Sequence, residues 1–109
     1  MITFITHMRV RAENAVAFEA LMSDMCDKVR EREPQVLHYS FARSTNDPAT
    51  YVVIEVYHDA SAHADHMESA WVKSSIPKSV LLVEDGKFDI RQYVSPGTEP
   101  VRRRFQPEG

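Results

Sequence analysis

The sequence contains few of the residues on which several kinds of functional site depend. It has one cysteine and three glycines in 109 residues. Because Cys26 is alone, an internal disulfide and a metal site built from several thiolates are excluded, which fits a reducing compartment. The glycines form no glycine-rich loop, so there is neither a phosphate cradle nor a dinucleotide fingerprint. We therefore expect no bound cofactor.

The sequence also lacks a large excess of one sign of charge and any long apolar run. The formal net charge is -3 at pH 7, and acidic and basic residues are interspersed, so the basic patches typical of nucleic-acid-binding proteins are lacking. His7 and Arg9 interrupt the apolar residues at the start of the chain, and neither a signal-peptide core nor a membrane-spanning run is present. We predict a cytoplasmic protein that binds neither nucleic acid nor membrane.

The apolar residues that are present follow strand and helix periodicities in turn. Alternation predicts strands over residues 2–10 and 36–44, and a run of strand-forming residues predicts one over 50–57. A last strand is predicted over 87–94, after the turn signal at residues 85–86. Helical spacing predicts one helix from Ala12 to just before Pro34 and a second that starts at Asp59 or Ser61, with Pro77 in the first turn of a further short helix. The order βαββαβ predicts an α+β, ferredoxin-like fold with a four-stranded antiparallel sheet.

Two local packing predictions follow from the same periodicities. Leu37, Tyr39 and Phe41 are expected together on one face of the second strand. Cys26 lies on the apolar stripe of the first helix, where a cysteine is most often a small core residue, so a reactive thiol is not expected.

The predicted sheet has more apolar surface than one layer of helices covers. In residues 50–57 both faces are apolar, which is typical of a strand that is covered on both sides. Since soluble monomers rarely expose such a patch, we predict a homodimer in which two sheets pack face to face. Residues 1–94 form the predicted domain. Residues 95–109 form an irregular tail, whose arginines are expected to contact the partner subunit: Arg102, Arg103 and Arg104.

The five histidines form no recognisable metal-binding motif. His63 and His66 are three residues apart, with no glutamate where a helical zinc motif needs one, so no metal site is predicted, and His63 is expected to face solvent. Polar and aromatic groups are instead mixed on one strand and one helix, at Glu55, Tyr57, His66, Met67 and Trp71. Apolar walls with a few polar atoms suit a small planar organic ligand.

These residues resemble the antibiotic biosynthesis monooxygenase family, which includes quinol monooxygenases, and the similarity covers roughly residues 2 to 94. It is carried by residues 36–39, 46–48, 54–59 and 66–69. The family pattern is a strand with a glutamate, an aromatic two residues later, an acidic start to a helix, and a histidine followed three residues later by serine. In this chain the pattern is formed by Glu55, Tyr57, Asp59, His66 and Ser69.

The resemblance implies a dimeric α+β barrel that oxygenates a small aromatic phenol or quinol with dioxygen, without metal, flavin or haem. Such a reaction needs a base near neutral pH, which we predict to be His66, with Glu55 holding its tautomer. A dry pocket would surround the phenolate. The predicted substrate-binding residues are His7, Phe41, Tyr57, Met67 and Trp71.

The chain departs from the family pattern at one place. Many members carry a second histidine shortly after the serine, where this sequence has Ala70 and Trp71. Two other functions therefore stay open, an isomerase of a small metabolite with the same fold and a binding module without turnover. Haem degradation is not expected. Haem-degrading relatives of this fold bind the haem iron with a histidine after the second helix, and this chain has no histidine beyond residue 66.

Overall fold

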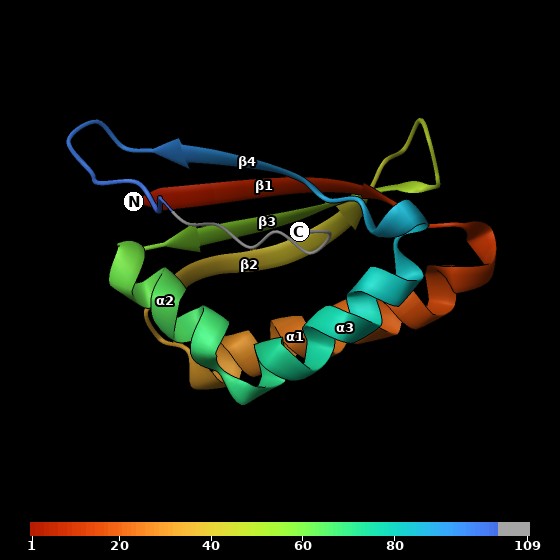
Figure 1. The fold of residues 1–109 in the computed structure, drawn as a ribbon, viewed down its shortest axis with the longest axis horizontal. Helices are drawn as coiled ribbons and strands as arrows, with labels where there is room; N and C mark the ends of the chain where they lie inside the picture. Colours follow the sequence, from red (N-terminus) through yellow and green to blue (C-terminus); the bar gives the residue numbers. More distant parts are fainter. Residues whose placement is uncertain (103–109) are drawn as a thin grey trace.

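Four antiparallel strands form one sheet, and the helices lie on one of its faces (Figure 1). The computed structural model describes residues 1–102. The strands are β1 (Ile2–Arg9), β2 (Val36–Arg43), β3 (Thr50–Tyr57) and β4 (Asp89–Val94), in the order β2-β3-β1-β4. This is the arrangement that βαββαβ connectivity gives when both crossovers pass the same face. The predicted ferredoxin-like α+β fold is confirmed.

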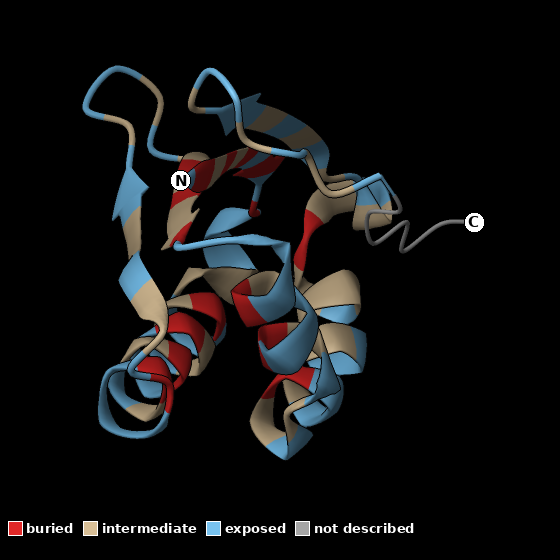
Figure 2. Cartoon of the chain, turned by 90° about the vertical axis from the view of Figure 1, so that its left-hand side faces the viewer, coloured by how far each residue is buried: buried red, intermediate tan, exposed pale blue. Residues whose placement is uncertain are grey.

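The helical layer consists of α1 (Ala15–Arg32), α2 (Ala60–Glu68) and α3 (Ala70–Leu82), with short 3-10 turns at Ala12–Asn14 and Glu84–Gly86. The predicted apolar stripe of α1 is confirmed and packs on the sheet through Phe18, Met22, Met25 and Val29. Cys26 beside this stripe is half-buried, and burial raises the pKa of its thiol. Buried residues concentrate where the helices and the sheet face each other (Figure 2).

The second helical region begins and divides at side-chain caps. The Asp59 carboxylate accepts from the Ala62 backbone N–H at 2.9 Å, so the start at Asp59 is the correct one of the two predicted. Ser69 ends α2 and begins α3, because its extended backbone breaks the helix while its hydroxyl accepts from the Val72 N–H at 3.3 Å. This cap starts α3 early, so the prediction that Pro77 opens a helix is wrong: Pro77 lies inside α3.

A β-bulge at the start of β2 changes which side chain faces the helices. The register shifts between Val36 and His38, and Val36 pairs with Tyr57. Val36 therefore packs in the core, whereas Leu37 is 51% exposed. The prediction that Leu37 shares a face with Tyr39 and Phe41 is wrong, because one extra residue reverses the alternation locally.

The face of the sheet opposite the helices has no covering layer in the described residues (Figure 1). Ile5 of β1 and the outward side chains of β3, Val52, Ile54 and Val56, lie at its centre and are half-buried by their neighbours. This face is apolar at the middle of the sheet, as the sequence predicts.

The segment after β4 turns back along the face of the sheet that the helices cover. The Gln92 side chain donates to the Val101 carbonyl at 2.9 Å and accepts from its N–H at 2.7 Å. Val101 packs against the core cluster that contains Ile2, Phe4 and Tyr57. Residues 103–109, with Arg103 and Arg104, lie outside the described residues, so the predicted contact of the tail with a partner stays a prediction.

Candidate functional site

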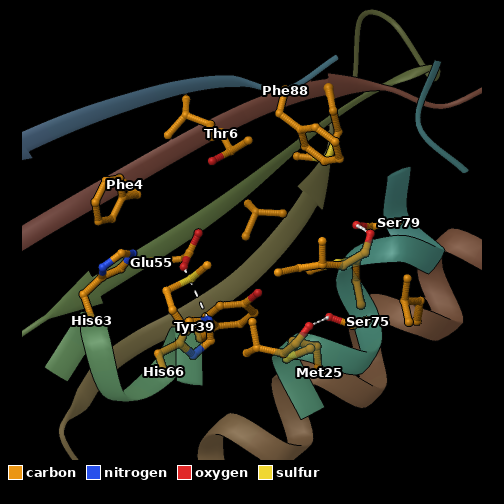
Figure 3. A pocket seen from close by; sticks show the side chains of 18 of the residues that line it. Phe4, Thr6, Met25, Tyr39, Glu55, His63, His66, Ser75, Ser79 and Phe88 are labelled. Atoms are coloured by element: carbon orange, nitrogen blue, oxygen red, sulfur yellow. Dashed lines mark hydrogen bonds and ion pairs between the residues drawn. The ribbon is translucent and has the colours of Figure 1, made fainter. Parts of the chain in front are cut away.

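A cavity of about 130 Å³ lies between the sheet and the helices (Figure 3). An apolar cavity of about 150 Å³ accommodates a benzene ring, so this cavity has the size for one aromatic ring. Most of its wall is apolar, and the methionines that line it are Met8, Met22, Met25 and Met67. Thioether side chains adapt to a flat ring and make favourable sulfur–aromatic contacts.

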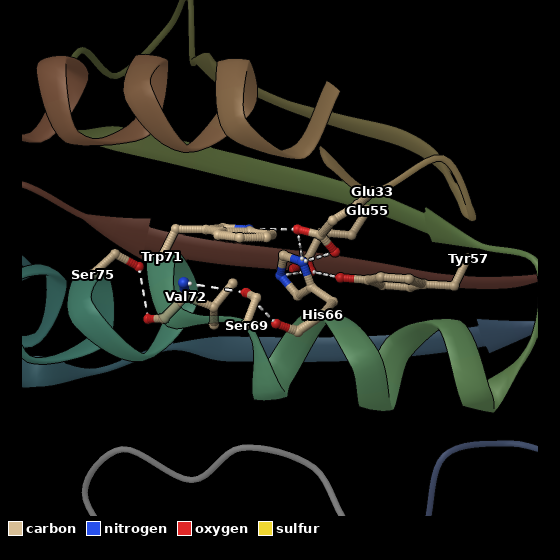
Figure 4. A network of polar contacts seen from close by, with 8 residues as sticks. All are labelled: Glu33, Glu55, Tyr57, His66, Ser69, Trp71, Val72 and Ser75. Atoms are coloured by element: carbon tan, nitrogen blue, oxygen red, sulfur yellow. Dashed lines mark hydrogen bonds and ion pairs between the residues drawn. The ribbon is translucent and has the colours of Figure 1, made fainter. Parts of the chain in front are cut away.

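The polar wall of the cavity centres on His66, in the last turn of α2. His66 is 3% exposed, and its Nδ1 lies 2.9 and 3.1 Å from the two carboxylate oxygens of Glu33 (Figure 4). The Trp71 indole N–H donates to Glu33 Oε2 at 2.7 Å. Since a carboxylate accepts and an indole only donates, Nδ1 of neutral His66 carries its proton, and Nε2 has a free lone pair.

Glu33 reaches His66 because of where α1 ends. Its backbone N–H donates to the Val29 carbonyl at 2.9 Å, and Pro34 follows it, so Glu33 is the cap residue of the helix. Glu33 is four positions after Val29, which places it on the same buried side of α1. The side chain of a carboxylate that is 4% exposed must be satisfied by donors, and here His66 and Trp71 supply them.

Glu55 stands on the other side of the His66 ring. Its Oε1 lies 3.8 Å from His66 Nε2, too far for a hydrogen bond, and the Tyr57 hydroxyl donates to the same oxygen (Figure 4). Burial raises the pKa of Glu55, and His66 and the Tyr57 hydrogen bond partly offset this. Burial and the Glu55 charge raise the pKa of Tyr57, which stays a donor. The lone pair of Nε2 and the Glu55 carboxyl thus border one gap.

His63 completes this end of the cavity and does not face solvent as predicted. Its ring lies 4.8 Å from the ring of Phe4 and 5.0 Å from that of Tyr57. Burial, followed by the charge of His66, lowers the pKa of His63 to about 4. His63 is therefore neutral at neutral pH and contributes a flat, weakly polar wall.

Most of the site residues predicted from the sequence lie at the cavity or directly behind its wall. His66, Glu55 and Met67 line the cavity. Glu33, and not Glu55 as expected, holds the tautomer of His66. Tyr57 and Trp71 lie behind this wall and act through their hydrogen bonds to Glu55 and Glu33, and the Arg32 guanidinium lies 5.4 Å from the Trp71 ring.

Phe41 and His7 do not take the predicted positions. Phe41 packs against the core cluster that contains Phe18 and Tyr51. His7 is exposed on the other face of the sheet, because its register partners Val52 and Asp89 point outward. Neither residue lines the cavity.

Besides His63, sequence reasoning missed three residues of the site: Glu33, Tyr39 and Thr6. A charged residue that continues the apolar stripe of α1 was the available signal for Glu33. Tyr39 and Thr6 carry no comparable signal, since a tyrosine and a threonine on the inward face of a strand are ordinary core residues. Only the packing of three elements around one space shows that they line a cavity.

The described residues contain neither a cluster of metal ligands nor a helix that could span a membrane. No group of three or more histidine, cysteine or acidic side chains in residues 1–102 is arranged to hold a metal ion. No helix in this part of the chain has both the length and the apolar character needed to cross a membrane.

Comparisons with known proteins agree with this architecture. Residues 1–76 match the family model described as antibiotic biosynthesis monooxygenase. A solved protein from Caulobacter crescentus, described as a candidate antibiotic biosynthesis monooxygenase, is 25% identical with a TM-score of 0.79; the match covers 84% of this chain and 86% of that one.

Two further solved structures carry the same description. The protein from Deinococcus radiodurans is 18% identical with a TM-score of 0.78, and the match covers 94% of this chain and 100% of that one. The protein from Nitrosomonas europaea is 21% identical with a TM-score of 0.77, and the match covers 88% and 99%. At these identities the similarity establishes a shared fold. No curated protein is similar enough in sequence to match.

Proposed function

The chain belongs to the antibiotic biosynthesis monooxygenase family, and we propose that it oxidises a small aromatic phenol or quinol with dioxygen, without metal, flavin or haem. One observation supports this above the others. A buried histidine, with its Nδ1 held by a carboxylate, directs a free lone pair into a ring-sized cavity walled by methionines.

The first step is removal of the substrate's hydroxyl proton by His66 Nε2. The imidazolium that forms has Glu33 at Nδ1, 2.9 Å away, and Glu55 at Nε2, 3.8 Å away. Both carboxylates therefore lie close to the positive charge that develops on the ring as the proton is transferred. General base catalysis of this kind contributes about 10²–10⁴-fold to a rate.

The second step is electron transfer from the phenolate to dioxygen. A ring C–H is converted to a carbonyl, one oxygen atom enters the ring and the other leaves as water, so the substrate supplies all four electrons. The apolar wall of the cavity excludes bulk water from the phenolate and from the oxygenated intermediate. A site that provides a base and excludes water suits a substrate that is activated by deprotonation alone, as a phenol or quinol is.

Oxygen uptake with a panel of phenols and quinols tests the proposal. We expect uptake matched by formation of the quinone product, and a loss of about 10²-fold or more in His66→Gln. His58→Gln is the matched control, because His58 is exposed just beyond β3. Thermal unfolding of each variant shows whether the fold persists. Turnover that proceeds equally well without oxygen would identify an isomerase, and tight ligand binding without turnover would identify a binding module.

The apolar sheet face supports the proposal that the protein acts as a homodimer. Val52, Ile54 and Val56 form a row along β3 that only a further layer would remove from water. Light scattering should give twice the chain mass, and Ile54→Lys should give the chain mass, since a charge at the centre of the contact is unpaired. A monomeric parent protein would contradict this.

A further inference from the structure

Two hydroxyl groups of the cavity have no hydrogen-bond partner among residues 1–102. They belong to Thr6 of β1, which is 7% exposed, and to Tyr39 of β2, which is half-buried (Figure 3). Other hydroxyls around the cavity are paired. Those of Ser75 and Ser79 donate to carbonyls of α3 at 3.0 and 2.8 Å, and that of Tyr57 donates to Glu55.

The described residues include no fully buried side-chain polar atom that lacks a partner, so both hydroxyls are open to water in the cavity. A ligand that displaces this water must supply a matching atom, or it leaves the hydroxyls unpaired at a cost in free energy. The register places Thr6 opposite Val53 and Tyr39 opposite Glu55, so β3 runs between the two hydroxyl-bearing residues. The two hydroxyl groups therefore belong to the sheet wall of the cavity, on either side of β3.

Tyr39 is a hydrogen-bond donor at neutral pH. Burial, with a smaller contribution from the Glu55 charge, raises the pKa of its hydroxyl well above the usual value, so the proton stays on the oxygen. Its ring lies 5.4 Å from the ring of His66. The atom that Tyr39 binds is thus an acceptor, and it belongs to the same small ligand that gives its proton to His66.

We propose that Tyr39, together with Thr6, forms a polar subsite that selects substrates carrying a second oxygen atom, a carbonyl or a further hydroxyl, besides the one that His66 deprotonates. This inference rests on the proposed function, because it assumes an aromatic ligand in the same cavity. In this role Tyr39 distinguishes rings that carry two oxygen atoms from simple phenols. A simple phenol has no second oxygen atom that could accept a hydrogen bond from Tyr39. Neutral hydrogen bonds of this kind discriminate by about tenfold.

Anaerobic calorimetry with matched ligand pairs tests the subsite. The pairs are 4-hydroxybenzaldehyde with 4-methylphenol, and 2-hydroxybenzaldehyde with 2-methylphenol, which differ by a carbonyl oxygen. Tyr39→Phe should weaken the binding of at least one hydroxybenzaldehyde about tenfold and leave its methylphenol partner unchanged, and Thr6→Val should act in the same direction. Tyr93→Phe and Thr3→Val are the controls, since both residues lie on the opposite face of the sheet.

The outcomes separate this subsite from the proposed function. If the parent protein binds all four ligands and Tyr39→Phe weakens both members of each pair equally, the tyrosine acts by ring packing and the subsite is refuted. Unchanged affinities in both Tyr39→Phe and Thr6→Val refute it as well. If none of the four ligands binds the parent protein, the aromatic cavity itself is wrong, and the proposed function fails together with the subsite.

Discussion

The contact between Glu33 and His66 leads to a sharp prediction about the tautomer of His66. In the parent protein both oxygens of Glu33 accept, from His66 Nδ1 and from the Trp71 indole N–H. Glu33→Gln replaces one oxygen with an NH₂ group. Since the indole can only donate, the amide oxygen turns to Trp71 and the NH₂ group turns to His66. Nδ1 then accepts, and the ring proton moves to Nε2.

The structure sets the size of the effect. To recover the productive tautomer, the amide must turn its NH₂ group toward the Trp71 N–H, which leaves a buried donor unpaired at a cost of about 1–3 kcal/mol. The productive form is then populated about 5–150-fold less, and kcat should fall by that factor. Trp71→Phe removes the competing donor, so it should lower the rate of the parent protein slightly but raise the rate of Glu33→Gln.

Nitrogen-15 NMR of the imidazole ring reads the tautomer without any substrate. We expect an Nδ1–H signature in the parent protein and an Nε2–H signature in Glu33→Gln, with Glu31→Gln, an exposed neighbour, unchanged. The reasoning is refuted if His66 keeps its tautomer in Glu33→Gln. Strictly additive effects of the Glu33 and Trp71 substitutions on kcat would equally refute it, because the argument requires the two groups to be coupled.

Most of the fold was predictable because its elements have strong periodicities. The alternation in β1 and the stripe of α1 each bury one face, and these patterns determine the layers. The errors occurred where one local interaction outweighed the pattern. The bulge exposes Leu37, and the Ser69 cap begins α3 well before Pro77, although proline is most common in the first turn of a helix.

The site was predictable only in part, because its polar network joins distant parts of the chain. His66 and Glu55 follow a short motif, and the structure brings them together at the cavity. Glu33 comes from the end of α1, 33 residues from His66 along the chain, so no local motif links them. Trp71, expected as a pocket wall, instead holds Glu33 by its indole N–H, which gives this departure from the family pattern a structural role.

Three further substitutions test the packing and the charges of the site. Pro77→Ala restores the missing N–H inside α3 and should stabilise the protein by about 1–2 kcal/mol in urea unfolding; a loss of stability would show that the helix is bent there for packing. His63, with its pKa lowered to about 4, is neutral in the folded state while the unfolded state binds a proton below about 6.5, so stability should fall as the pH drops from 6.5 to 4. His63→Gln should remove roughly 1–2 kcal/mol of this loss, after allowance for solvent around the half-buried ring, and equal pH dependence of both proteins would contradict the assignment. Tyr57→Phe removes the hydroxyl that donates to the Glu55 carboxylate, and because this hydrogen bond favours the charged form, its loss raises the pKa of Glu55 further. A Glu55 that is charged less often stabilises the imidazolium of His66 less, so kcat near neutral pH should fall while the affinity for a methylphenol stays the same. An unchanged kcat would show that Glu55 takes no part in the proton transfer.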